Sequence, residues 1–329
     1  MIKKINYLFI ASIFLLLNSC SDTGDTPFFD MDTTPPVIAE VTAVTTPSNN
    51  NTPDYTFSST ESGPISYDGS CSSSTTSASS GDNTITLNSL SDGTYSDCTI
   101  IVSDTYGNES ELLTLSSFTI DSTAATLVET SAIDSSTNDS TPDYTFVSSE
   151  AGTITYSGSC SSNTTSASAG ANTITLNSLS EGTYSDCKIT VTDSLNNAVT
   201  LSLSSFEIDT TAPTVTTFTT TADNQSAVAI TDNITVTFSE EMDTTTVTTN
   251  TDNTSCTGTL RVSSDNFSSC IQMSSSSPVS SDYITFILDP SDNLTGGTTY
   301  KTRVTTGVTD SAGNALSSQY DNSTGFTTQ

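Results

Sequence analysis

The segment TPDYTFSSTESGPISYDGSCSSSTTSASSGDNTITLNSLSDGTYSDCTIIVSD, Thr52–Asp104, occurs a second time as TPDYTFVSSEAGTITYSGSCSSNTTSASAGANTITLNSLSEGTYSDCKITVTD, Thr141–Asp193. Each copy is followed by a related segment, LTLSSFTID from Leu113 and LSLSSFEID from Leu201. The spacing of 89 residues between Thr52 and Thr141 exceeds the period of solenoid repeats and suits a small β-sandwich. The sequence therefore predicts two copies of one folding unit.

Apolar side chains alternate with polar ones inside each copy. Tyr55 and Phe57 flank a threonine, and Ile85 and Leu87 follow the same parity. Strict alternation places one face of a strand in the core and the other in water, as in antiparallel sandwiches. Serine, threonine, asparagine and glycine dominate between these runs, which marks turns, and no segment beyond residue 20 shows a sustained helical period. The predicted fold class is all-β.

The junctions ahead of the units also repeat. Asp32, Asp121 and Asp209 begin the linkers Asp-Thr-Thr-Pro-Pro, Asp-Ser-Thr-Ala-Ala and Asp-Thr-Thr-Ala-Pro. Together with LSDGTYSDCTIIVSDTYGN from Leu90, these linkers resemble the tandem immunoglobulin-like (Ig-like) arrays of bacterial surface proteins. The resemblance implies three tandem Ig-like antiparallel β-sandwiches after a signal peptide and a short tether, with the domains at 35–122, 123–210 (a repeat of the first) and 211–329.

The last unit has a sequence of its own. ITVTFSEEMDTTTVTTN from Ile234, LTGGTTYKTRVTTGVTDSAGNALSS from Leu294 and GFTT from Gly325 resemble, in this order, motifs of the SbsA-type bacterial Ig-like domain. That family is named from a surface-layer protein. Two departures stand out: Glu241 occupies a position where the family usually has proline, and the stretch between Cys256 and Cys270 looks like a local elaboration.

The N-terminus has the features of an export signal. Two lysines precede an apolar run, Tyr7–Leu17, that is too short to span a membrane. The run ends in Leu-Asn-Ser-Cys20, which resembles the bacterial lipobox; an ordinary signal peptide that ends near a cysteine is the alternative. We therefore expect a lipoprotein signal peptide at 1–19, a lipid on Cys20 and an acidic flexible tether at 20–34.

The residue after the lipid site bears on localisation. Ser21, rather than aspartate, follows Cys20, and by resemblance to the enterobacterial sorting rule this favours the bacterial outer membrane. We expect contact with the membrane through the lipid and domains exposed at the cell surface. A periplasm-facing orientation is the alternative.

The cysteine count agrees with export. The chain has seven cysteines, an odd number for an exported protein. Setting Cys20 aside leaves six, two in each unit, and in an oxidising compartment such pairs form disulfides. We expect three bonds, each within one unit: Cys71–Cys98, Cys160–Cys187 and Cys256–Cys270.

Charge and composition exclude several functions. The formal net charge is −31, with 37 acidic and 6 basic residues, and such a surface repels nucleic acids and anionic headgroups. Histidine is absent, which removes histidine-activated nucleophiles and histidine ligation of metals. A carboxylate pair among Glu240, Glu241 and Asp243 is the remaining catalytic candidate, but solvated acids or a hard cation are commoner in such loops. We do not expect an enzyme.

Calcium is the one cofactor that the pattern suggests. Asp104 with Asn108, and Asp193 with Asn197, lie in loops that lead toward the junctions containing Asp121 and Asp209. Asp310 and Asn314 repeat the spacing in the last unit. Oxygen ligands suit calcium, so we hypothesise structural calcium at the junctions. The alternative is that these residues simply form turns, which Asp and Asn favour without a metal.

Two function classes remain from the sequence. The first is a lipid-anchored, non-catalytic surface stalk or adhesion module, an elongated monomer because the linkers between domains are short. The second is a ligand-binding module for a glycan, another envelope protein or a calcium-dependent partner. A ligand module should carry exposed aromatic side chains on one domain, whereas a spacer should be coated with threonine and serine throughout.

Overall fold

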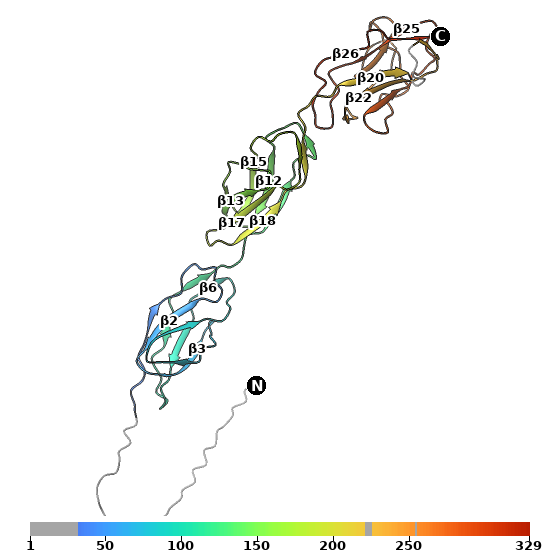
Figure 1. Cartoon of the computed structure of the whole chain (residues 1–329). Helices are drawn as coiled ribbons and strands as arrows, with labels where there is room; N and C mark the ends of the chain where they lie inside the picture. Colours follow the sequence, from blue (N-terminus) through green and yellow to red (C-terminus); the bar gives the residue numbers. More distant parts are fainter. Residues whose placement is uncertain (1–31, 221–225, 254) are drawn as a thin grey trace, which may run out of the picture. The chain divides into compact units, whose positions relative to one another are not determined.

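The computed structural model describes residues 32–220, 226–253 and 255–329 (Figure 1). Within these ranges every regular element is a β-strand, as the all-β prediction requires, and no helix is long and apolar enough to cross a membrane. The predicted signal peptide, Cys20 and most of the predicted tether lie outside the described residues.

One compact unit comprises residues 32–44, 52–88 and 95–117. It contains a three-stranded antiparallel sheet in the order β1-β2-β5 and a four-stranded sheet in the order β4-β3-β7-β8. Their bounds are β1 Ile38–Thr42, β2 Asp54–Ser59, β3 Gly63–Asp68, β4 Ser77–Ala78, β5 Gly81–Thr86, β7 Thr99–Val102 and β8 Leu113–Thr114. Tyr55 and Phe57 on β2 are buried and their neighbours are not, so the period of two in the sequence does set the buried face.

The second compact unit comprises residues 45–51, 89–94 and the described residues from 118 onward. Its second-repeat sheets keep the strand order of the first repeat, as β10-β12-β15 and β14-β13-β17-β18, and β11-β19-β16 forms a third sheet. Their bounds are β10 Leu127–Ser131, β11 Ser136–Thr137, β12 Asp143–Ser148, β13 Gly152–Ser157, β14 Ser166–Ala167, β15 Gly170–Thr175, β16 Gly182–Tyr184, β17 Lys188–Thr192, β18 Ala198–Ser202 and β19 Phe206–Ile208. A two-stranded sheet joins β6, Gly93–Tyr95, to β9, Phe118–Ile120.

The sheets after residue 214 have a different topology. One has the order β20-β22-β24, and the other has the order β21-β27-β25-β23 with β26 paired to β25. Their bounds are β20 Val215–Thr220, β21 Ser226–Val228, β22 Ile234–Phe238, β23 Leu260–Ser263, β24 Thr285–Leu288, β25 Thr299–Val304, β26 Tyr320–Asp321 and β27 Phe326–Thr328. Both sheets bury alternate residues, among them Ile234, Val236 and Phe238 on β22 and Phe286 and Leu288 on β24.

Two of the sandwiches have separate hydrophobic cores. Tyr144, Phe146 and Phe206 belong to a cluster formed by residues 133–208. Phe238, Phe286 and Tyr300 belong to another, formed by residues 228–326. Each segment therefore buries its own apolar face, as an independent Ig-like sandwich must. The division of the whole chain into three domains remains our proposal.

The six described cysteines lie in the pairs that the sequence predicts. Cys71 and Cys98 have Cα atoms 5.2 Å apart, as do Cys160 and Cys187, and the Cα atoms of Cys256 and Cys270 are 5.0 Å apart. The first two bonds are buried in their sandwiches. Because each closes a loop within one repeat, each constrains the unfolded state of that repeat alone.

Candidate functional site

Among the described residues, acidic side chains gather at three places, one in each of the two repeats and one in the segment from Asp209 onward. The groups are Asp32–Glu61–Asp104, Asp121–Glu150–Asp193 and Asp209–Glu240–Asp310, and in each the three ligand oxygens lie within 4.8 Å of one another. The first member of each group is the aspartate that begins a linker. The same arrangement thus forms in two near-identical repeats and in a third domain with a different sequence.

A tight turn supplies the last aspartate of each group. In the first group, the Oδ1 atom of Asp104 accepts hydrogen bonds of 2.8 Å from the backbone N–H groups of Tyr106 and Asn108. Gly107 between them has a φ of 89°, in the left-handed region where glycine is unstrained. Equivalent bonds hold Asp193 and Asp310. The carboxylate is therefore fixed by the backbone before any ligand binds.

An asparagine ties this turn to the linker. The Nδ2 atom of Asn108 donates to Asp104 Oδ2 at 2.6 Å and to the backbone carbonyl of Asp32 at 2.9 Å. The same two bonds are made by Asn197 (2.8 Å to Asp193 Oδ2 and 3.0 Å to the Asp121 carbonyl) and by Asn314. A carboxylate oxygen and a backbone carbonyl both accept, so the amide nitrogen, which is the donor, faces these two groups. Asn108 and Asn197 thus hold each turn to its linker through the amide nitrogen. Their role as calcium ligands, which would fall to the amide oxygen, stays a prediction.

A glutamate that follows a strand completes each group. Glu61, Glu150 and Glu240 lie two residues after the ends of β2, β12 and β22. Glu61 and Glu150 were not predicted from the sequence, and Glu240 was considered as a catalytic acid, with a solvated acid or a hard-cation ligand as the commoner alternatives. The signal was present: an acidic residue at the same offset after the same strand in all three units. Recognising it requires knowing that this strand end lies beside the Asp-Asn turn.

The pairing of turns with linkers also differs from the expectation. Asp104 and Asp193 were predicted to lie toward the linkers that contain Asp121 and Asp209, which follow them in the chain. Instead, Asp121 joins Asp193, and Asp209 joins Asp310. Each linker aspartate thus joins the turn of the sandwich that comes after it. The physical reason is the asparagine, which binds the carbonyl of the preceding linker.

Crowding of like charges shows in the pKa values of the glutamates. Burial, and then the negative charges of Asp209 and Asp310, raise the pKa of Glu240 above its usual 4.5. Burial, Asp121 and Asp193 raise the pKa of Glu150 in the same way. Burial raises the pKa of Asp193, but hydrogen bonds from the Asn197 side chain and backbone outweigh burial and lower that pKa below its usual value. Without a cation, Glu150 and Glu240 are therefore harder to ionise than an isolated glutamate.

Glu241 and Asp243 do not join the third acidic group. With Tyr283 and Ser311 they line a shallow cavity of about 340 Å³. Tyr283 is 54% exposed and has a left-handed φ of 56°. An exposed aromatic side chain is thus present in the last sandwich, but Tyr106 of the first repeat is also exposed, so exposed rings are not restricted to one domain.

Comparison with known proteins identifies the last part of the chain. Residues 209–328 match the family model of the bacterial Ig-like domain, so this segment is a bacterial Ig-like domain. The group Asp209–Glu240–Asp310 lies entirely within it. No curated protein matches the chain.

The chain is also similar to solved structures. One is SGBP-B of the mixed-linkage glucan utilization locus of Bacteroides ovatus, in complex with a mixed-linkage heptasaccharide. The two sequences are 16% identical, and the TM-score is 0.19. The match covers 89% of this chain and 64% of that protein, so the chain spans less than two thirds of its length.

Proposed function

We propose that the chain is a lipid-anchored, non-catalytic module of the bacterial cell envelope, built of three tandem Ig-like domains, in which a divalent cation fixes the start of each domain. The observation that carries the proposal is the acidic group that forms around the linker aspartate ahead of each domain. An Ig-like domain in the last segment agrees with a surface module.

Calcium is the cation that suits these groups. It takes about six to eight oxygen ligands in flexible geometry and prefers carboxylates, whereas the protein supplies neither histidine nor free thiolates to the groups. Asp121, Glu150 and Asp193 carry three like charges that a divalent ion would neutralise. They come from a linker, a strand end and a turn. Binding would fasten the linker to the body of its own domain.

The proposed anchor is the lipid on Cys20. It is supported by the lipobox-like Leu-Asn-Ser-Cys20 and by the export signal ahead of it. The pairing of all six remaining cysteines agrees with an oxidising compartment. The outer membrane, with the domains at the cell surface, follows from Ser21 by the sorting resemblance.

Metabolic labelling tests the anchor. Cells grown with a labelled fatty acid should mark the wild-type chain and not the Cys20→Ala variant; equal label in both would rule the anchor out. Protease added to intact cells should remove the domains if they face outward. Protection from protease would instead place them in the periplasm.

Thermal unfolding tests the cation. With a dissociation constant of about 0.1–1 mM, calcium at about 10 mM stabilises each site by roughly 1.4–2.7 kcal/mol. This corresponds to a rise in Tm of roughly 6–20 °C for a domain of this size. Sodium chloride at equal ionic strength should give a much smaller rise. Asp121→Ala and Asp209→Ala should remove the calcium effect at their own domains, whereas Asp134→Ala, at an exposed aspartate outside the groups, should not.

A ligand-binding role is the second candidate. Tyr283 beside Glu241 and Asp243 supports it, because an exposed ring next to carboxylates is a common way to hold a sugar. Tyr283→Ala should then reduce binding of the cells or the protein to a glycan array. An unchanged array profile would reject this ligand-binding role for Tyr283 and leave the stalk as the remaining function.

A further inference from the structure

Basic residues are rare in this chain and three of them share one surface. Arg261 lies on β23, Lys301 and Arg303 lie on β25, and Arg261 is the direct cross-strand partner of Arg303. Of the other three basic residues, two belong to the predicted signal peptide and the third is Lys188. All cations of the last sandwich are thus on two adjacent strands. We call Arg261, Lys301 and Arg303 the cationic face.

The cationic face points away from the core. On β25 the buried residues Tyr300, Thr302 and Val304 alternate with the half-exposed Lys301 and Arg303. Arg261 is likewise flanked by buried residues on β23. Like charges directly opposite each other destabilise an antiparallel pair. In a chain with 37 acidic residues, stability alone would favour an acid opposite arginine, so the arrangement calls for a function.

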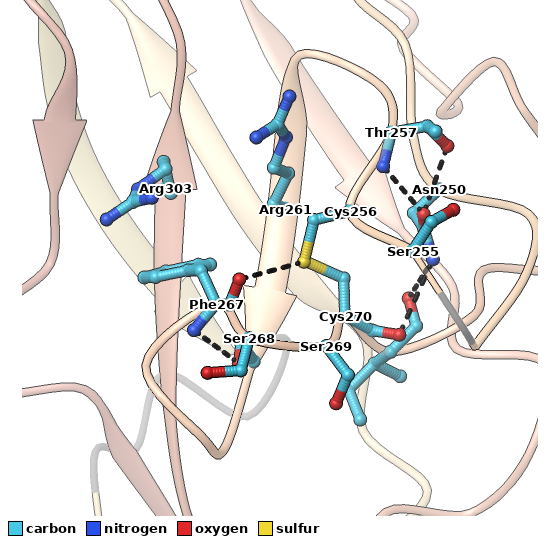
Figure 2. The surroundings of a disulfide bond; sticks show 12 residues. Asn250, Ser255, Cys256, Thr257, Arg261, Phe267, Ser268, Ser269, Cys270 and Arg303 are labelled. Atoms are coloured by element: carbon cyan, nitrogen blue, oxygen red, sulfur yellow. Dashed lines mark hydrogen bonds between the residues drawn. A yellow bond between two sulfur atoms is a disulfide. The ribbon is translucent and has the colours of Figure 1, made fainter.

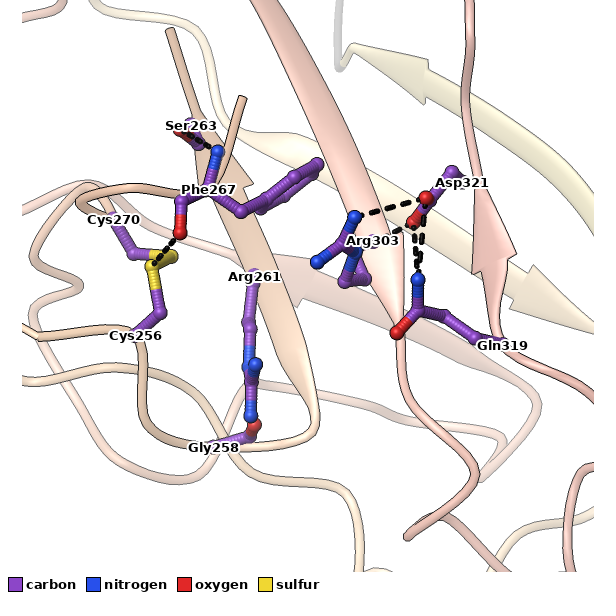
Figure 3. A network of polar contacts seen from close by, with 9 residues as sticks. All are labelled: Cys256, Gly258, Arg261, Ser263, Phe267, Cys270, Arg303, Gln319 and Asp321. Atoms are coloured by element: carbon purple, nitrogen blue, oxygen red, sulfur yellow. Dashed lines mark hydrogen bonds and ion pairs between the residues drawn. A yellow bond between two sulfur atoms is a disulfide. The ribbon is translucent and has the colours of Figure 1, made fainter. Parts of the chain in front are cut away.

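Arg303 is held in a fixed orientation. Its Nε donates to Asp321 Oδ1 at 2.7 Å, and a terminal nitrogen donates to Asp321 Oδ2 at 2.9 Å. The guanidinium carbon also lies 3.9 Å from the centroid of the Phe267 ring. Figure 3 shows Arg303 between this ring and Asp321, with Gln319 drawn below the carboxylate, to which its amide nitrogen donates. A bidentate ion pair and a cation–π contact together fix the guanidinium plane.

A disulfide loop supports the aromatic ring. Cys256 and Cys270 bracket β23 and the turn that carries Phe267 (Figure 2). The backbone N–H of Phe267 donates to Ser263 Oγ at 2.9 Å. Phe267 and Asn266 have φ values of 64° and 59°, a conformation that costs free energy in residues other than glycine and that surrounding contacts must maintain. The elaboration noticed in the sequence thus holds Phe267 beside the cationic face.

Arg261 and Lys301 keep their charge available. Nε of Arg261 donates to the Gly258 carbonyl at 2.9 Å, which leaves its two terminal nitrogens for a ligand. Within the part of the chain that the structure describes, Arg303–Asp321 is the single ion pair. The positive charge of the cationic face therefore rests on Arg261 and on Lys301, whose charge also acts on the Asp321 carboxylate and helps to lower its pKa.

The surroundings narrow the class of ligand. The net charge of −31 repels densely charged polymers such as nucleic acids. None of the exposed large apolar side chains lies on β23 or β25, so the face lacks the apolar centre of a protein interface. An open sheet face suits an extended polymer rather than an enclosed small molecule. A chain of sugars with carboxylates spaced by neutral units meets all three conditions.

We propose that the outward face of β23 and β25 binds an acidic polysaccharide, whose uronate carboxylates pair with Arg261 and Lys301. Arg303 pairs with Asp321 and stacks on Phe267, so it shapes the surface and does not offer its charge to the ligand. The surface hydroxyls of Thr299 and Thr327, which lie 3.0 Å apart on β25 and β27, extend the same face with groups that hydrogen-bond to sugars. This binding site uses no residue of the acidic groups, so it does not depend on the proposed cation sites.

Titration calorimetry tests the proposal on the full mature chain carrying Cys20→Ala. The probes are hyaluronan oligosaccharides of several lengths, in which a neutral sugar separates successive uronates, each with a carboxyl-reduced counterpart, in calcium-free buffer. At least one acidic probe should bind, and its carboxyl-reduced form should bind at least about tenfold more weakly. Arg261→Gln and Lys301→Gln should each weaken binding by about tenfold, and salt near 0.5 M should weaken it further.

Matched variants separate loss of charge from loss of fold. Lys188→Gln removes a more exposed cation from the second repeat and should leave the affinity unchanged. Arg261→Lys should keep part of the affinity that Arg261→Gln loses. Absence of binding to every acidic probe would overturn the proposal, as would equal affinity in wild type and the Arg261→Gln/Lys301→Gln variant. Stronger binding to poly-glutamate than to the sugars would identify a protein partner and reject the polysaccharide.

Discussion

Replacing Glu240 by glutamine should have opposite effects on stability with and without calcium. Glu240 and the ligand oxygens of Asp209 and Asp310 lie within 4.8 Å of one another. At that distance two ionised carboxylates repel by about 0.9 kcal/mol in bulk water and about 3.5 kcal/mol at an effective dielectric constant of 20. Because Glu240 and Asp209 are partly exposed, we expect values near the lower limit.

The variant Glu240→Gln removes two such repulsions while keeping the size of the side chain. In chelator, it should stabilise the last domain by about 1–2 kcal/mol, a rise in Tm of about 4–10 °C. In about 10 mM calcium the variant has lost a ligand, so the wild type should gain more stability than the variant. The assay is differential scanning calorimetry of the mature chain in both buffers.

The neighbouring glutamate provides the control. Glu241 is exposed and outside the acidic group, so Glu241→Gln should change Tm little in either buffer. If Glu240→Gln lowered Tm in chelator, or kept the full calcium-induced rise, the reasoning about this group would be wrong.

Three further predictions follow from the same contacts. First, because the pKa of Glu240 is raised above 4.5, the stability tied to its protonated form is lost as pH rises through that raised value. Melting of the wild type in chelator should therefore give a higher Tm near pH 4.5 than at pH 7, and this rise in Tm should be smaller in Glu240→Gln. An equal rise in the wild type and the variant would show that the pKa shift is absent. Second, Asn197→Ala removes both bonds that tie Asp193 to the linker carbonyl. It should lower the Tm of the second repeat by roughly 4–16 °C, equivalent to about 1–2 kcal/mol, and weaken calcium binding there. A calcium titration of the variant that gave wild-type affinity would contradict this prediction. Third, replacing Cys160 and Cys187 by alanine should cost about 3–4 kcal/mol by the loop-entropy estimate for a 27-residue separation, measurable by urea unfolding, and a cost below about 1 kcal/mol would reject that estimate.

Much of the fold could be predicted because the sequence repeats and alternates. Tyr55 and Phe57 show a period of two that the sandwich preserves, and the counterpart residues Tyr144 and Phe146 repeat it at the same parity. The cysteine pairs follow from counting within each unit. These features are local, so they do not depend on knowing how the strands pair.

Features that depend on register could not be predicted. Glu150 approaches Asp121 and Asp193 only because a strand end and a turn meet at one end of the sandwich. Arg261 faces Arg303 only because β23 pairs with β25 in one register. The bonds of Asn197 depend on the same arrangement, because its amide nitrogen reaches the Asp121 carbonyl and Asp193 Oδ2 only where the linker meets the turn.

Calcium stoichiometry tests the central claim most directly. Isothermal titration of the mature chain with calcium should show three sites per chain, one for each acidic group. The variants Glu61→Gln, Glu150→Gln and Glu240→Gln should each remove or weaken one site, and the combined variant should bind none in the millimolar range typical of extracellular modules. No calcium binding by the wild type at about 10 mM, or equal binding by the wild type and the combined variant, would contradict the account.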